Sequence, residues 1–126
     1  MKRCWFGMVL LGVLLAGGLA SFLVMDALHT PISEDLAQAS RYAQAGDWEE
    51  ADALTARARQ RWDKYRRSTA ALVDHKPMED VEGLFARLEV YRNAREREAY
   101  AALCAQLSTL VRAIAEIHSP SWWNLL

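Results

Sequence analysis

Twenty-two consecutive residues near the N-terminus, positions 4–25, carry no charged side chain. A helix rises 1.5 Å per residue, so this run spans about 33 Å and can cross a hydrocarbon core of about 30 Å. The rest of the chain is strongly charged and is long enough for one small domain, not two. We therefore predict a transmembrane anchor at residues 1–25 and a water-soluble domain at residues 26–126.

Two basic residues, Lys2 and Arg3, precede the apolar run, and the next Lys or Arg after it is Arg41. Basic residues at one end of a span favour retention of that end in the cytoplasm. The pattern predicts a single-pass protein of the cytoplasmic membrane, with its N-terminus inside and residues 26–126 outside. A cleaved secretory signal, cut after Ala20, is the alternative. The uncleaved anchor is favoured because residues 22–25 continue the apolar run without a polar break.

The charge of the predicted domain narrows the range of partners. Residues 26–126 hold 13 Lys and Arg against 16 Asp and Glu, a net charge of −3, with no basic stripe. Nucleic-acid binding is therefore disfavoured.

In the predicted topology Cys4 and Cys104 lie on opposite sides of the membrane and cannot form an intramolecular disulfide. We expect Cys104 to be a small, buried, apolar residue.

The pattern of the domain is typical of helices throughout. Glycine and proline are sparse after residue 30, and no stretch alternates apolar and polar residues as a strand does. Pro31 is expected to end the membrane helix, and Ser33 to cap a short helix at about 33–45. Gly46 suits the left-handed position after that helix, and Asp47 suits the cap of the next, at about 47–74. This long helix carries a seam of apolar and small residues at three- and four-residue steps: Trp48, Ala51, Thr55, Ala58, Trp62, Tyr65, Thr69 and Leu72.

Two further helices complete the domain. Pro77 suits the first position of a third helix, at about 77–93, and Asn93 is tolerated in a left-handed break after it. The fourth helix, at about 95–118, is lined by Leu103, Leu107, Leu110, Ile114 and Ile117. Connections this short make neighbouring helices antiparallel. The predicted fold is all-α, with one transmembrane helix followed by a small antiparallel bundle of about four helices.

The densest polar cluster consists of Asp74, His75, Glu79 and Asp80. It could bind a divalent cation or respond to pH. The favoured interpretation is structural: a helix end, a loop and a helix start, where acids cap backbone amides. The three histidines show no metal-ligand spacing, and neither a nucleophile elbow nor a phosphate-binding loop occurs. We therefore predict no catalytic, metal-binding or cofactor-binding residue, and a protein that is not an enzyme.

Two tryptophans near the end of the chain, Trp122 and Trp123, lie outside any helical pattern. Their amphipathic rings suit an interface. They could cap the bundle, lie at the membrane surface or insert into a groove of a partner protein. Capping is favoured because a domain of about 100 residues has a limited core.

Several short motifs are spread along the chain: Gly-Asp-Trp-Glu-Glu-Ala at 46–51, Trp62, Asp74-His75, Asp80-Val81, Leu-Phe-Ala-Arg-Leu at 84–88 and Asn-Leu-Leu at 124–126. Together with the basic start and the single apolar span, they make the chain resemble the domain of unknown function 4363 family over nearly all of its length. The resemblance implies a small, membrane-anchored helical protein of bacteria. It brings no established activity with it, so it assigns no catalytic or binding residues.

The sequence thus predicts a structural or protein-interaction module at the bacterial cell envelope. A single membrane span would hold it there, and it would dock a protein partner, with Trp122 and Trp123 as possible interaction residues. Two alternatives remain open. One is an ion- or pH-responsive sensor that uses the corner from Asp74 to Asp80, and the other is a non-catalytic accessory subunit of a membrane protein.

Overall fold

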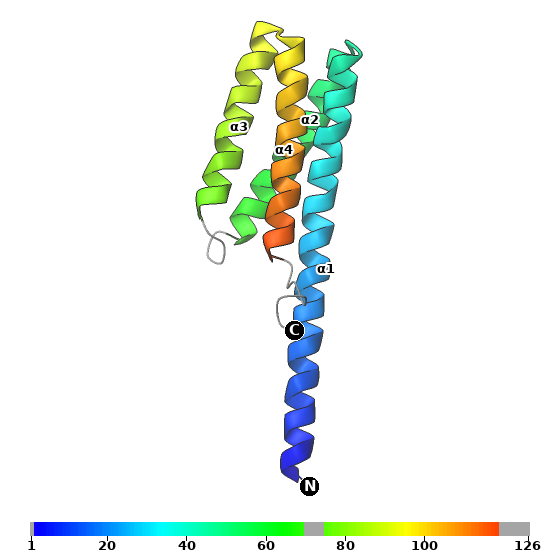
Figure 1. The fold of residues 1–126 in the computed structure, drawn as a ribbon, viewed down its shortest axis with the longest axis vertical. Coiled ribbons are helices and arrows are strands. Elements are labelled where there is room, and N and C mark those ends of the chain that lie inside the picture. Colours follow the sequence, from blue (N-terminus) through cyan, green and yellow to red (C-terminus); the bar gives the residue numbers. More distant parts are fainter. Residues whose placement is uncertain (1, 70–74, 119–126) are drawn as a thin grey trace.

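A computed structural model of the protein describes residues 2–69 and 75–118. These residues form four α-helices and no strand: α1 (Lys2–Gln44), α2 (Trp48–Thr69), α3 (His75–Ala94) and α4 (Arg97–His118). The upper part of α1 packs with the other three helices in an antiparallel bundle, and its lower part projects from the bundle as a stalk (Figure 1). The all-α prediction, an apolar N-terminal helix followed by a small bundle, is confirmed.

The first helix differs from the prediction, because it does not break at Pro31. It runs without interruption through 43 residues, with Pro31 inside it. Proline in a helix interior costs about 3 kcal/mol. The neighbouring residues Ile32 and Leu36 are fully buried, and the burial of such side chains is worth about 1.5–3 kcal/mol each, which offsets that cost. Ser33 is therefore not a cap: it is buried mid-helix, and its hydroxyl donates to the Thr30 carbonyl at 3.1 Å.

The turn between α1 and α2 follows the prediction. Gly46 has a φ of +83°, the left-handed conformation that glycine adopts readily. The amides of Gly46 and Asp47 donate back to the carbonyls of Ala43 and Tyr42 at 3.0 and 2.9 Å, which closes the C-terminus of α1. The Asp47 carboxylate accepts the Glu50 amide at 3.4 Å and so caps α2.

Two other predicted helix ends are displaced. The third helix begins at His75, so Pro77 is its third residue and not its first; the amide that proline lacks would be unpaired there anyway. The left-handed residue after α3 is Arg95, with a φ of 58°, and not Asn93. The Arg95 amide donates to the Arg92 carbonyl and the Glu96 amide donates to the Tyr91 carbonyl, the same pattern that closes α1 at Gly46. These backbone bonds therefore decide which residue is left-handed. The second helix is described as far as Thr69, and the predicted extension to 74, with Leu72, lies outside the described residues.

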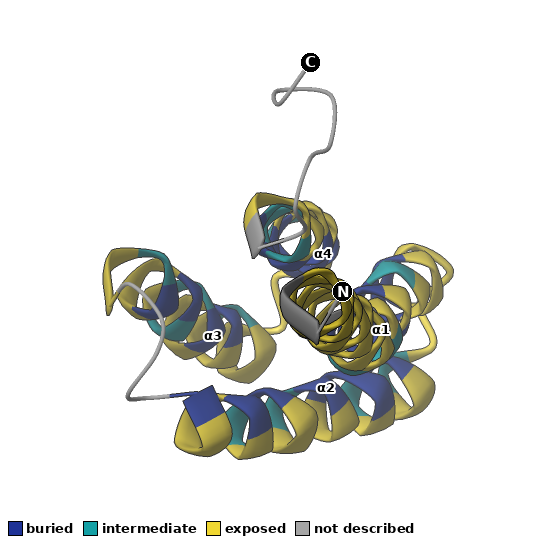
Figure 2. Ribbon diagram, turned by 90° about the horizontal axis from the view of Figure 1, so that it is seen from below, coloured by how far each residue is buried: buried dark blue, intermediate teal, exposed yellow. Residues whose placement is uncertain are grey.

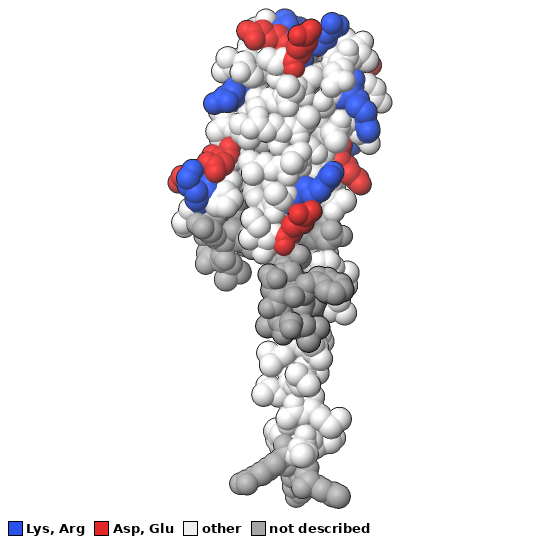
Figure 3. Space-filling view, viewed as in Figure 1, with Lys and Arg blue, Asp and Glu red and all other residues white. Residues whose placement is uncertain are grey.

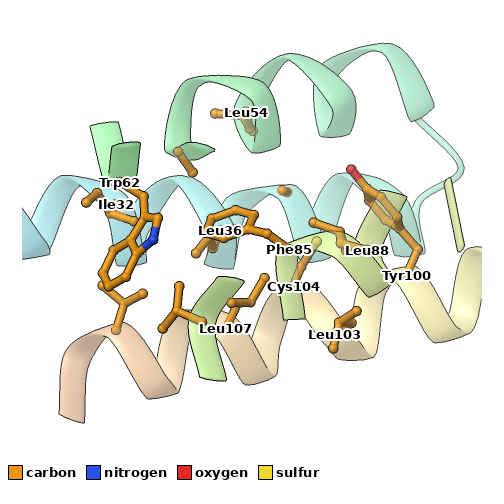
Figure 4. Close-up of a cluster of buried hydrophobic side chains, with 14 of the residues drawn as sticks. Ile32, Leu36, Leu54, Trp62, Phe85, Leu88, Tyr100, Leu103, Cys104 and Leu107 are labelled. Carbon is orange, nitrogen blue, oxygen red and sulfur yellow. The ribbon is translucent and has the colours of Figure 1, made fainter. Parts of the chain in front are cut away.

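The bundle core is made by the inward faces of all four helices (Figures 2 and 4). The largest fully buried side chains include Trp62, Tyr65 and Tyr100. Of the predicted α2 seam, every described residue is buried except Trp48, which is half-buried and packs against Tyr100. On α4 the predicted lining residues Leu103, Leu107 and Ile114 are buried and Leu110 is half-buried, whereas Ile117 is 75% exposed.

The helices do not all pack equally. The first helix lies against both α2 and α4, and α3 lies against α4. The backbones of α2 and α3 stay further apart, and long side chains bridge them. One side of the bundle is therefore more open than the other three.

Candidate interaction surfaces

The stalk of α1 exposes a continuous apolar surface. Every residue from 4 to 24, named here the apolar segment, is exposed, and the large side chains there include Trp5, Phe6 and Phe22. The described part of the stalk carries no charged side chain, in contrast to the bundle (Figure 3). The helix from Cys4 to Gln44 is long and apolar enough to cross a membrane, and none of its most apolar window is buried.

A second helix meets the same length and composition criteria. The residues Arg97–Ile117 of α4 qualify, but 44% of their most apolar window is buried inside the bundle. Fully buried residues such as Tyr100, Cys104 and Leu107 lie on this helix. The apolar character of α4 is therefore accounted for by its place in the core.

Two buried serines fix α4 against α1. The Ser40 hydroxyl donates to the Ala101 carbonyl at 2.7 Å, and the Ser108 hydroxyl donates to the Ser33 carbonyl at 2.7 Å. A step of seven residues along α1 matches a step of seven along α4, so both bonds define one antiparallel register. Small side chains at these positions let the two backbones approach closely.

A buried carboxylate joins α1 to α2. Asp35, whose side chain is 6% exposed, accepts hydrogen bonds from Arg57 Nη2 at 2.6 Å, Arg57 Nε at 3.0 Å and Arg61 Nη1 at 2.6 Å. Arg61 also reaches the Pro31 carbonyl at 3.4 Å. Bonding and charge from Asp35 raise the pKa of the Arg57 guanidinium. The two guanidinium groups are about half exposed, so each remains partly hydrated while it neutralises the buried acid.

A second acidic residue, Glu82, joins α3 to α2. Its Oε1 accepts the Trp62 indole N–H at 2.9 Å, and its Oε2 accepts Arg59 Nη2 at 2.8 Å. Arg66 lies at 3.6 Å from the same carboxylate. At the other end of these helices Arg92 lies 3.7 Å from Asp52. These polar contacts span the open side of the bundle.

A groove of about 430 Å³ lies between α2 and α3 on that open side. Its apolar side chains include Phe85 and Leu88, and its charged ones are two arginines and two glutamates. The full lining is Thr55, Ala56, Arg59, Glu82, Phe85, Ala86, Leu88, Glu89, Arg92 and Tyr100. The mixture of signs gives the groove no preference for an anion or a cation.

The buried polar groups beside this groove bond with one another. Tyr100 and Thr55 share a hydrogen bond of 2.8 Å, and burial raises the pKa of Tyr100. Burial, with a smaller contribution from the Asp52 carboxylate, raises the pKa of the Cys104 thiol to about 12. A thiol of that pKa is protonated at neutral pH and is a poor nucleophile. Cys104 is buried, as expected, and Cys4 is exposed; both are free thiols.

The predicted polar corner is only partly within the described residues. His75, Glu79 and Asp80 lie in the first two turns of α3 and are exposed, and Lys76 forms an ion pair with Asp80 at 2.8 Å. Asp74 lies outside the described residues, as do Trp122 and Trp123. Within residues 2–69 and 75–118, no group of three or more His, Cys, Asp or Glu side chains is placed to hold a metal ion.

The sequence interpretation missed Asp35 as a buried residue. It expected a new helix to begin at Ser33, and Asp35 would then lie near the exposed start of that helix. The overlooked signal is the spacing of Ile32, Leu36, Ala39 and Ala43, which puts Asp35 on the edge of the buried stripe once the helix is continuous. Arg57 and Arg61, four residues apart on α2, supply the matching charges on one face.

The fold and these surfaces define a small all-helical protein in which one helix first exposes an apolar segment and then enters an antiparallel bundle. The chain belongs to the family described as domain of unknown function (DUF4363), whose model matches residues 21–125. The match covers the bundle and the last turn of the apolar segment. No curated protein and no solved structure matches the chain.

Proposed function

We propose that this protein is a membrane-anchored interaction module of the bacterial cell envelope. The apolar segment holds the bundle at the outer face of the cytoplasmic membrane, and the bundle docks a membrane or envelope protein. The observation that carries the proposal is the continuity of α1, in which 21 consecutive exposed residues without a charge lead directly into a packed bundle.

The exposed apolar side chains of the apolar segment support the proposed anchor. Large apolar side chains such as Trp5, Phe6 and Leu10 are more than 60% exposed along the segment. An exposed apolar surface of this extent indicates a site that contacts a membrane or another protein. Lys2 and Arg3 at its start favour a cytoplasmic N-terminus.

A non-catalytic role is supported by the use of the buried polar groups. Asp35, Ser40 and Ser108 each bond to another helix, and the Cys104 thiol is protonated in the core. These groups hold the bundle together and are not directed at a substrate. The exposed surface of the bundle is therefore the part available for a partner.

Membrane fractionation and crosslinking in the native cell test the proposal. We expect the full-length chain to resist extraction with alkaline carbonate and to keep residues 1–20, as mass spectrometry of its N-terminus will record. Photoreactive amino acids in place of Ala86 in the groove, or of Ala102 and Ala105 on exposed α4 positions, are expected to give an adduct with one defined protein. A chain that is cut after Ala20, or that is extracted by carbonate, would contradict the anchor; adducts only between copies of the chain would contradict a separate partner.

A further inference from the structure

We propose that the lower end of the bundle is a lipid-contacting surface, formed by the last turns of α2 and α4. Ile117 lies at the boundary between headgroups and acyl chains, and Arg67 faces the phospholipid phosphates. This inference rests on the proposed membrane anchor and adds to it a second contact with the same bilayer.

The register of α4 against α1 places Ile117. Ser108 bonds to Ser33, and Ser40 bonds to Ala101, so the two helices run antiparallel residue for residue. Nine residues beyond Ser108 on α4 is Ile117, and nine residues before Ser33 on α1 is Val24. Ile117 is thus level with Val24, inside the uncharged run 4–25. Figure 1 shows this end of α4 beside α1, below most of the bundle.

The contacts of α2 place Arg67 at nearly the same level. Arg57 pairs with Asp35, and the Tyr65 ring meets the His29 ring at a centroid distance of 4.3 Å. Continuing along the two antiparallel helices, Arg67 falls opposite positions 25–27 of α1. Arg67 is exposed, and it forms none of the ion pairs found among the described residues.

Because α1 is continuous, only a short length of helix separates the apolar segment from the bundle. Ile117 and Arg67 therefore stay close to the membrane. His29, the first fully buried residue, is only five positions after Val24, which is about 7.5 Å of helix. The headgroup layer on one side of a bilayer is about 5–8 Å thick. A bundle that begins within this distance of the hydrocarbon core must meet the headgroups, and tilting α1 only brings one side of it closer.

The two side chains suit this depth. Ile117 is 75% exposed at the end of a helix whose other large apolar side chains are buried or half-buried. A bilayer boundary would remove that apolar surface from water. Arg67 can extend its aliphatic stem along the boundary and place its guanidinium among the phosphates.

The test measures the depth of single sites in the full-length chain. The chain is incorporated in nanodiscs of phosphatidylcholine with a minor fraction of phosphatidylglycerol, with Cys4→Ser and the buried Cys104 retained. A fluorescent label is attached at Ile117→Cys or Arg67→Cys, and nitroxides on the lipid headgroups act as quenchers. The matched controls are Val90→Cys and Arg41→Cys, an exposed apolar residue and an exposed arginine at the far end of the bundle. We expect at least a threefold stronger quenching at Ile117 and Arg67 than at their controls.

A lengthened helix provides the second arm. Seven uncharged helix-forming residues inserted between Asp26 and Ala27 raise the bundle by about 10.5 Å and rotate it by only about 20°. Quenching at Ile117→Cys is then expected to fall to the level of Val90→Cys. Equal quenching at all four sites, or no change on insertion, would overturn the inference while leaving the anchor intact. A chain that does not incorporate in nanodiscs at all would instead overturn the proposed anchor.

Discussion

Trp62 takes part both in the apolar core and in a polar contact between two helices. It is fully buried, its ring packs 5.4 Å from Tyr65, and its indole N–H bonds to Glu82 across the open side of the bundle. One residue of α2 therefore serves both the apolar core and the polar bridge to α3.

Replacement of Trp62 by alanine is expected to lower the free energy of unfolding by about 3–5 kcal/mol, because it leaves a large cavity and removes the bond to Glu82. Trp62→Phe should lose less, since it keeps an aromatic ring. Denaturant unfolding of the chain in detergent, followed by circular dichroism, measures both. Val90→Ala, at an exposed site, is the control and should change stability by no more than about 0.5 kcal/mol. A Trp62→Ala effect as small as that of the control would contradict the structure.

The burial of Trp62 could be predicted from sequence, because the seam on α2 repeats at helical spacing. Its partner Glu82 could not, since the choice among acids on another helix depends on how the two helices cross. The burial of Asp35 was missed for a related reason: a serine that follows a proline is typical of a helix start, so a new helix was expected at Ser33. Only the continuity of α1 moves Asp35 to a buried position.

At the scale of the element, α1 keeps a proline in its interior where local propensity predicts a break. The residues on both sides are strongly held, by burial of Ile32 and Leu36 after Pro31 and by the uninterrupted helix before it. Arg61 additionally donates to the Pro31 carbonyl. Tertiary packing thus outweighs the local preference.

Pro31→Ala is expected to raise the free energy of unfolding by about 1–3 kcal/mol, since alanine restores a backbone donor and removes the clash of the ring. Thermal melting of the full chain measures the change. Gln38→Ala, an exposed substitution on the same helix, should leave the melting temperature nearly unchanged. A lower melting temperature for Pro31→Ala would mean that the proline ring itself is needed at this site.

The pairing of α1 with α2 through Asp35 predicts a non-additive response. Either Arg57→Ala or Arg61→Ala leaves one guanidinium on the buried carboxylate, so each is expected to lower the melting temperature only slightly. The double variant leaves that carboxylate buried without a cation, and its loss should exceed the sum of the two. Adding Asp35→Asn to the double variant should recover part of the loss, because a neutral amide is less costly to bury. Additive single effects would argue against a shared buried partner.

Helix ends differ in how well sequence could place them. The turn at Gly46 and Asp47 was predicted correctly, because a left-handed glycine and an acidic cap are strong local signals. The left-handed residue that closes α3 was placed at Asn93 and is Arg95, since the preference of asparagine for the left-handed region is weak compared with the backbone bonds that close the helix.

At the scale of the whole molecule, several buried weak acids make stability depend on alkaline pH. Burial raises the pKa of Cys104 to about 12 and raises the pKa of Tyr65 and Tyr100. An unfolded thiol ionises near pH 8.5 and an unfolded tyrosine near pH 10. Above these values the unfolded chain holds fewer protons than the folded chain, so the free energy of unfolding falls as pH rises.

The melting temperature is therefore expected to be level between about pH 7 and 8 and to fall progressively from about pH 9 to 12. Scanning calorimetry of the detergent-solubilised chain at these pH values measures it. Cys104→Ala removes one of the groups, so its curve should fall less steeply above pH 9. Parallel curves for the two proteins would show that the thiol does not contribute.

The overall architecture could be predicted, because hydrophobic spacing and short connections define antiparallel helices. The apolar segment could be found as well, since it depends on composition alone. The groove between α2 and α3 could not: its existence depends on the helix-crossing geometry, which the seam on α2 and the apolar face of α3 do not encode. The polar corner at His75, Glu79 and Asp80 remains a prediction.

Residues 28–44 and the apolar segment lie on one continuous helix. The number of residues between them therefore sets how far one is rotated about the helix axis relative to the other. One residue more or fewer near Ala27 would turn the whole bundle by about 100° around the helix axis. A partner protein that contacts the apolar segment and the bundle at once would then lose one of these two contacts. Members of the family are accordingly expected to conserve the number of residues between the apolar run and the turn at Gly46, even where the residues themselves vary.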